Sequence, residues 1–83
     1  MNGSAVRRLT SRRRTRAGQI FGRNLHRVCA ARGIDAARLA ELMGRSRGSI
    51  ERMLAGEGNP TLSFLGQVAH SIDVRLIDLV RGL

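Results

Sequence analysis

The chain has 83 residues, of which 42% are hydrophobic, so it can form one small domain and is too apolar to be disordered throughout. Its formal charge is +9 and all 15 basic residues are Arg, which indicates a polyanionic partner. Nucleic acid is the favoured partner, and an acidic protein or a membrane surface are the alternatives. No apolar run reaches the roughly 18 residues of a membrane span, and no signal-peptide pattern follows the N-terminus. With Cys29 as the single cysteine, we expect a soluble protein of the reducing cytoplasm.

Residues 1–16, MNGSAVRRLTSRRRTR, are expected to form a disordered arm, because blocks of like charge repel and the segment lacks helical periodicity. The arm carries +6, against +3 for the rest of the chain. We expect it to bind the DNA backbone, since flexible Arg side chains release counterions and can enter the minor groove. A solvated tail is the alternative. The arm residues are Arg7, Arg8, Arg12, Arg13, Arg14 and Arg16.

From residue 17 onward the apolar pattern is helical and predicts an all-α domain over residues 17–83. The first predicted helix ends at Gly33, which can take the positive φ of a helix C-terminus. Its apolar stripe consists of Phe21, Leu25, Val28 and Cys29. We therefore interpret Cys29 as a core residue and not as a nucleophile.

Residues 36–55 have the spacing of a helix-turn-helix. Asp35 is the expected cap of a helix over 36–43, Gly44 turns the chain, and Ser46 caps a second helix over 47–55. Apolar groups on facing sides of the two helices pack together. These are Leu39, Ala40, Met43, Ile50 and Met53. The outward face of the second helix carries two Arg residues and suits the DNA major groove.

Two further helices are predicted after the turn at residues 58–60. The first is capped by Thr61 and has the apolar set Leu62, Leu65, Val68, Ala69 and Ile72. The last ends at Gly82 and carries Val74, Leu76, Ile77, Leu79 and Val80. Because so short a helix cannot bury all this surface against a small core, we expect a homodimer through the C-terminal helix. Completion of the monomer core is the alternative.

The segment from Phe21 to Val80 resembles the lambda-repressor-like, Cro/XRE-type helix-turn-helix domains. The matching sequences, in the family's order, are RGI at 32–34, LAELMG at 39–44, Ser46, SIERM at 49–53, Gly56, NPTL at 59–62 and VA at 68–69. The resemblance implies a five-helix domain whose third helix enters the major groove, usually as a dimer on a two-fold symmetric operator. In length the chain is similar to Cro-like phage regulators, restriction–modification controller proteins and regulators of mobile elements.

Five positions depart from the family pattern. They are Ala36 in place of Gln, Arg45 in place of an apolar residue, Gly48 in place of a base-reading side chain, Leu54 in place of Glu and Asp73 in place of Gly. Arg45 is expected to add a phosphate contact. Because Ala36 and Gly48 lack the side chains that contact DNA in the family, they also keep open an alternative in which the fold binds a protein.

Within the second helix of the motif we expect Arg47 and Arg52 to contact bases, since Arg donates two hydrogen bonds to guanine; phosphate contact is the alternative. Glu51 is expected to restrain one of these Arg by an ion pair, and acceptance of a hydrogen bond from cytosine N4 is the alternative. Ser49 either contacts DNA or satisfies the helix N-terminus. The full set of expected DNA-binding residues is Arg45, Ser46, Arg47, Gly48, Ser49, Glu51 and Arg52.

The sequence therefore predicts a sequence-specific transcriptional regulator, expected to be a repressor or autoregulator, with duplex DNA, a second copy and RNA polymerase as candidate partners. The alternative is an antitoxin or antiactivator that binds a protein through this fold and DNA only non-specifically. We expect no enzymatic activity and no cofactor, and no metal because His26 and His70 lack ligands at metal-binding spacing. A bacterial or phage-encoded protein associated with the nucleoid is the expected setting.

Overall fold

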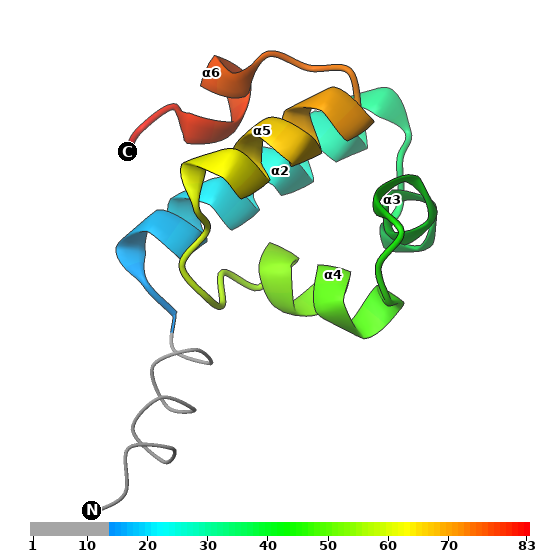
Figure 1. Cartoon of the computed structure of the whole chain (residues 1–83), viewed down its shortest axis with the longest axis horizontal. Helices are drawn as coiled ribbons and strands as arrows, with labels where there is room; N and C mark the ends of the chain where they lie inside the picture. The colour runs from blue at the N-terminus through cyan, green and yellow to red at the C-terminus, as the bar shows by residue number, and fades with distance from the viewer. Residues whose placement is uncertain (1–13) are drawn as a thin grey trace, which may run out of the picture.

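The computed structural model describes residues 14–83, which form five helices (Figure 1). These are α2 (Arg16–Arg32), α3 (Ala36–Met43), α4 (Arg47–Leu54), α5 (Leu62–Ser71) and α6 (Leu76–Val80). Within the described range there is no β-strand beyond an isolated parallel bridge between Arg14 and Gly58. The predicted all-α class with five helices is confirmed.

Local capping chemistry explains where the helices begin and end. The side chains of Asp35, Ser46 and Thr61 each accept a hydrogen bond from the backbone N–H three residues further on, at 2.8 to 3.1 Å. Gly33 and Gly44 take positive φ values of 69° and 63° at the ends of α2 and α3. All five caps were predicted from the sequence.

The folded domain begins earlier than predicted. α2 starts at Arg16 because Thr15 caps it, its Oγ1 accepting from the Gly18 N–H at 2.9 Å. The same hydroxyl donates to the Gly58 carbonyl oxygen at 2.8 Å, beside the bridge from Arg14. The boundary after residue 16 is therefore corrected: residues 14–16 belong to the domain.

The core lies where the five helices converge. Its largest buried side chains, each at most 2% exposed, are Phe21, Leu25, Leu39, Ile50, Val68 and Leu79. Cys29 is also buried, and this desolvation raises the pKa of its thiol above the ordinary 9.0, with the Arg32 charge opposing the effect. Leu62 contradicts its predicted place in the apolar set, because the first residue of α5 lies past the edge of this core and is 70% exposed.

Close backbone packing seats the end of α4 and the following loop on α2. A Cβ on Gly22 would lie 2.8 Å from the Met53 carbonyl oxygen. A Cβ on Gly18 would overlap the carbonyl oxygen of Gly58, in the loop after α4. The absence of side chains at these two glycines therefore sets the distance between α2 and α4. Neither glycine was singled out from the sequence.

A buried amide holds α6 to α2. Nδ2 of Asn24 donates to the carbonyl oxygens of Leu79 and Arg81, each at 2.9 Å, and Oδ1 accepts from Arg27 Nη2 at 2.8 Å. The chain reaches α6 through Asp73, which takes the left-handed φ of 55° at the position where the family has Gly.

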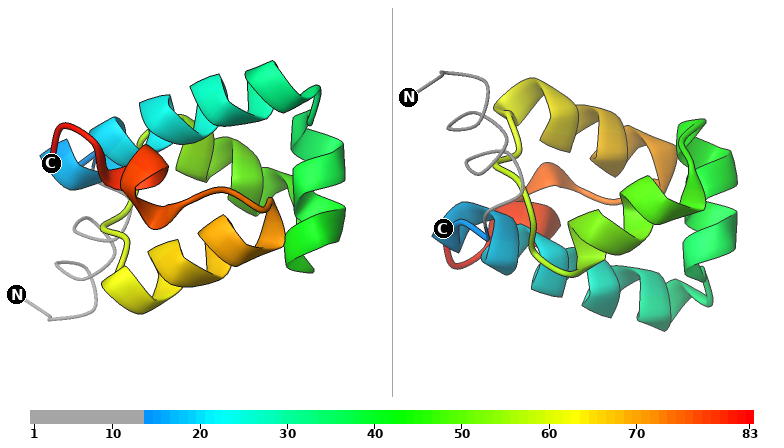
Figure 2. Two further views of the ribbon diagram at one scale, coloured as in Figure 1. Left: turned by 90° about the horizontal axis from the view of Figure 1, so that it is seen from above. Right: turned by 90° about the horizontal axis from the view of Figure 1, so that it is seen from below.

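α4 and α6 lie on opposite sides of the pair formed by α2 and α5 (Figure 1). The view from above has α6 in front, and the view from below has α4 in front (Figure 2). None of the helices between residues 14 and 83 combines the length and apolarity needed to cross a membrane.

Candidate nucleic-acid interface

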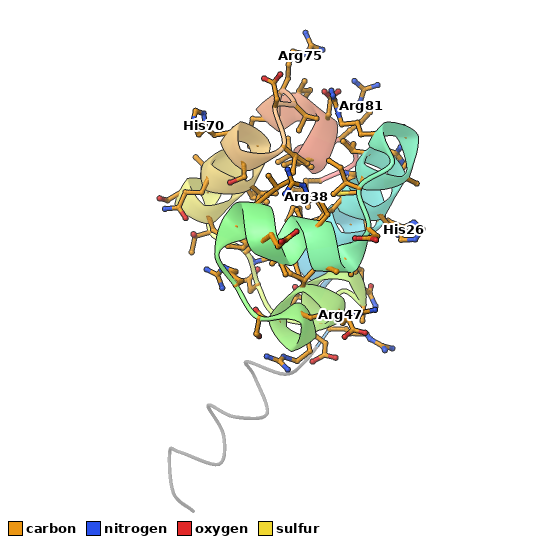
Figure 3. All side chains as sticks on the ribbon, turned by 90° about the vertical axis from the view of Figure 1, so that its right-hand side faces the viewer. His26, Arg38, Arg47, His70, Arg75 and Arg81 are labelled. Carbon is orange, nitrogen blue, oxygen red and sulfur yellow. The ribbon has the colours of Figure 1, made fainter. Side chains whose placement is uncertain are left out.

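The turn at residues 44–46 joins α3 to α4 and leaves most of α4 outside the core. Ile50 is the buried residue of α4, while Arg47, Gly48, Glu51 and Arg52 are exposed. The helix-turn-helix therefore presents the predicted recognition face to solvent. Figure 3 shows Arg47 pointing away from the body of the domain.

Glu51 restrains Arg47, as expected. Its Oε1 lies 3.9 Å from Arg47 Nε, one turn along α4, and both side chains are exposed. An exposed pair of this kind contributes less than about 1 kcal/mol, so Arg47 can leave it at small cost.

Arg52 and Gly48 lie together on α4. A Cβ at Gly48 would be 3.5 Å from Arg52 Nη1, so the guanidinium extends back toward the start of the helix, over the glycine. Among residues 14–83, Arg52 has no acidic partner within ion-pair distance. Within the described residues, the positive charge of Arg52 is therefore unpaired near the start of α4, where the predicted DNA contacts lie.

Arg45 rests on an aromatic pair that the sequence did not reveal. Its Cζ lies 4.6 Å from the centroid of the Phe64 ring. Phe64 meets Phe21 edge to face, with centroids 6.3 Å apart and planes at 80°. The replacement of an apolar residue by Arg45 was the signal that could have pointed to this stack.

An open groove of about 830 Å³ runs between α4, the loop after it and the start of α5. Arg45, Ser49 and Arg52 line it on the α4 side, and Asn59 and Phe64 on the other. Ser46 stands at the start of α4 as its cap, with its Oγ accepting from the Ser49 N–H at 3.1 Å. The groove thus brings together two cations, the Glu57 carboxylate, polar groups and the rings of Phe21 and Phe64.

The helix-turn-helix domain family matches residues 20–75 of the chain. The chain belongs to this family. Its fold is similar to that of the restriction-modification controller protein C.AhdI from Aeromonas hydrophila, with a TM-score of 0.67 and 26% sequence identity over 75% of this chain and 94% of that one. No curated protein sequence matches the chain. The resemblance seen in the sequence is confirmed: this helix-turn-helix protein is a DNA-binding transcription regulator.

The predicted arm of this helix-turn-helix protein is described in part. Arg7, Arg8, Arg12 and Arg13 lie outside the described residues, and their DNA contacts stay a prediction. Arg14 and Arg16 are exposed on the domain. Because Arg14 pairs with Gly58, which lines the groove, the chain enters the domain beside α4.

Two departures from the family pattern have a packing explanation. Ala36 and Leu54 both line a hollow of about 270 Å³ beside Cys29 and Leu39. Both are half-buried and pack against the core. Both substitutions therefore fit the packing of this helix-turn-helix domain.

The two histidines are far apart in this helix-turn-helix domain, and Figure 3 shows His26 and His70 on opposite sides of the molecule. Across residues 14–83, no three His, Cys, Asp or Glu side chains gather in a group able to hold a metal ion.

The C-terminal helix of this helix-turn-helix protein differs from its prediction in two ways: it begins at Leu76, so Val74 precedes it, and Leu79 has a different role. Leu76 and Ile77 are 36% and 47% exposed, and Val74 and Val80 are half-buried. Leu79 is fully buried, because it closes the core of its own chain beneath the Asn24 hydrogen bonds. Leu79 is therefore corrected from an interface residue to a core residue.

Proposed function

We propose that this protein is a sequence-specific regulator that binds duplex DNA with α4 in the major groove. The observation that carries the proposal is the exposed face of α4, where Arg47 and Arg52 extend into solvent beside the half-buried Ser49, on a helix supported by α3. Arg47 and Arg52 contact base edges, since each guanidinium can donate two hydrogen bonds to one guanine.

Flanking groups position the protein on the DNA backbone. Arg45 contacts a phosphate from its place on Phe64, and Ser46 and Ser49 add hydroxyl contacts near the start of α4. Gly48 allows a base edge to approach the backbone of α4 beside Arg52. The arm, through Arg7, Arg8, Arg12 and Arg13, adds phosphate contacts from the edge of the groove.

The regulatory role that we infer is that of a repressor or autoregulator which responds to its own concentration. The similarity to a restriction–modification controller protein supports a compact regulator of this kind. A homodimer formed through Leu76 and Ile77 of α6 supplies the concentration dependence. RNA polymerase is the further partner, excluded from an overlapping promoter, and the protein acts in the bacterial cytoplasm on the nucleoid.

The experiment first selects the preferred duplex from random DNA and then compares variants on that duplex and on unrelated DNA. Arg47→Ala and Arg52→Ala are each expected to lose about 1–3 kcal/mol on the preferred duplex, with relaxed preference at one guanine. Arg75→Ala is the control, since Figure 3 shows Arg75 on the side of the molecule opposite Arg47. Equal losses on both DNAs would assign the two Arg to phosphates, and a wild-type protein with no preferred duplex would overturn the proposal.

A further inference from the structure

The net positive charge of this chain comes from its first 34 residues. That segment holds nine of the 15 Arg residues and none of the six acidic residues. In residues 35–83 the remaining six Arg and the six acidic residues cancel. Residues 35–83 are therefore neutral overall, and α2 belongs to the basic part of the chain.

Three Arg residues of α2 form one stripe. Arg16, Arg23 and Arg27 are spaced by seven and four residues, which places them within about 40° of one another around the helix. All three are exposed, on the side opposite the buried Phe21 and Leu25. We call these three residues the α2 arginine stripe.

The α2 arginine stripe lacks the neutralisation found on other helices. Three Arg of the neutral segment form ion pairs: Arg38 with Glu41, Arg47 with Glu51 and Arg81 with Asp78. α2 contains no acidic residue, and within residues 14–83 no carboxylate lies within ion-pair distance of the stripe. Arg27 is instead held in place by the neutral, buried amide of Asn24, at 2.8 Å.

The placement of these charges opposes the stability of α2 itself. Arg16 lies in the first turn, where the helix dipole disfavours a cation. Arg23 and Arg27 repel each other one turn apart. A bound polyanion removes both penalties, and the planar guanidinium matches the geometry of a phosphate.

We propose that the α2 arginine stripe binds backbone phosphates of duplex DNA outside the stretch that α4 contacts. This inference rests on the proposed function. α2 meets the end of α4 through Gly22 and the loop after α4 through Gly18, and Arg23 and Arg27 lie about 100° or more around the helix from these glycines. DNA seated on α4 therefore does not contact Arg23 or Arg27. The stripe begins at Arg16, next to Thr15 at the groove, so the DNA that flanks the site is the duplex within its reach.

The test compares two duplexes, the shortest that keeps full sequence discrimination and the same duplex extended by about 10 bp on each side. The wild type is expected to bind the long duplex more tightly and with a steeper dependence of log affinity on log salt. Arg23→Gln and Arg27→Gln are each expected to flatten that slope by about 1 on the long duplex, and to leave binding of the short duplex unchanged. Gln has nearly the helix propensity of Arg, so α2 is retained, and circular dichroism checks the fold.

Arg75→Gln is the matched control, because it removes one exposed Arg that precedes α6 and leaves the stripe intact. Arg23→Gln also keeps the inference testable if loss of the Asn24 contact disturbs the Arg27 variant, since no described hydrogen bond involves the Arg23 side chain. Three results would overturn the inference. The first is no gain in affinity of the wild-type protein for the longer duplex. The second is a full gain in a double variant that carries both Arg23→Gln and Arg27→Gln, as expected if the stripe serves an acidic protein, and the third is equal losses on both duplexes. Failure of the proposed function is distinct, because the short duplex would then show no sequence preference.

Discussion

Gly22 sets how closely α2 approaches the end of α4. A Cβ there would lie 2.8 Å from the Met53 carbonyl oxygen and 3.0 Å from that of Leu54, and neither backbone segment can yield without moving a helix. We expect Gly22→Ala to lower the free energy of unfolding by about 1–3 kcal/mol, the usual cost of overpacking, in spite of the better helix propensity of Ala. Urea denaturation followed by circular dichroism measures the change.

Gly66→Ala is the control for the Gly22 variant. Gly66 lies within α5, is exposed, and has no atom within 4 Å of an added Cβ. This substitution is expected to raise the free energy of unfolding by about 0.5–1 kcal/mol. Stabilisation of both variants would mean that helix propensity, and not the contact with α4, decides the outcome at Gly22.

Residues whose partners are close in sequence were predictable, and those with distant partners were not. The caps Asp35, Ser46 and Thr61 bond to groups three residues away, so their side-chain chemistry and the helical period were sufficient. Asn24 bonds to carbonyls 55 and 57 residues away, and its role depends on how α6 packs. The stacking of Arg45 on Phe64 is tertiary in the same way.

At the scale of helices, the five-residue α6 depends on α2 for its position, because a helix this short is not stable alone. Asn24→Ala removes both donors to the carbonyls of Leu79 and Arg81. We expect a loss of about 1–3 kcal/mol in the free energy of unfolding, with faster amide exchange in α6 than in α3. Asn59→Ala, at an exposed loop residue, is the control and should change neither measurement. Unchanged exchange in α6 would show that burial of Leu79 alone holds the helix.

Helix bounds were predictable where apolar periodicity and a cap agreed, as in α3, which spans the predicted residues 36–43. The start of α2 was missed because Thr15 lies inside a run of Arg that indicated an arm by charge alone. The recognition face of α4 followed from the spacing of Ile50 and Met53. The groove beside it did not, because it is formed with residues of the next loop and of α5.

At the scale of the whole molecule, assembly is expected to depend on the exposed part of α6. Leu76 and Ile77 are exposed, whereas Leu79 is buried in the same helix. We expect Ile77→Asp to shift the protein from dimer to monomer in sedimentation velocity while it stays folded, and Leu79→Asp to unfold it. A wild type that stays monomeric at high micromolar concentration, with and without DNA, would contradict the dimer.

The N-terminal segment is expected to supply much of the affinity for DNA, since residues 35–83 have no net charge. Removing residues 1–13 deletes four Arg and leaves the Thr15 cap and the Arg14 bridge in place, so the free energy of unfolding should hardly change. Removing residues 1–16 also deletes that cap and should cost a further ~1 kcal/mol. Both truncations should flatten the dependence of log affinity on log salt by about 1 for each lost phosphate contact, equally on preferred and unrelated DNA. Filter-binding titrations over a salt series measure the slope, and a truncated protein with the parent slope would reduce this segment to a solvated tail.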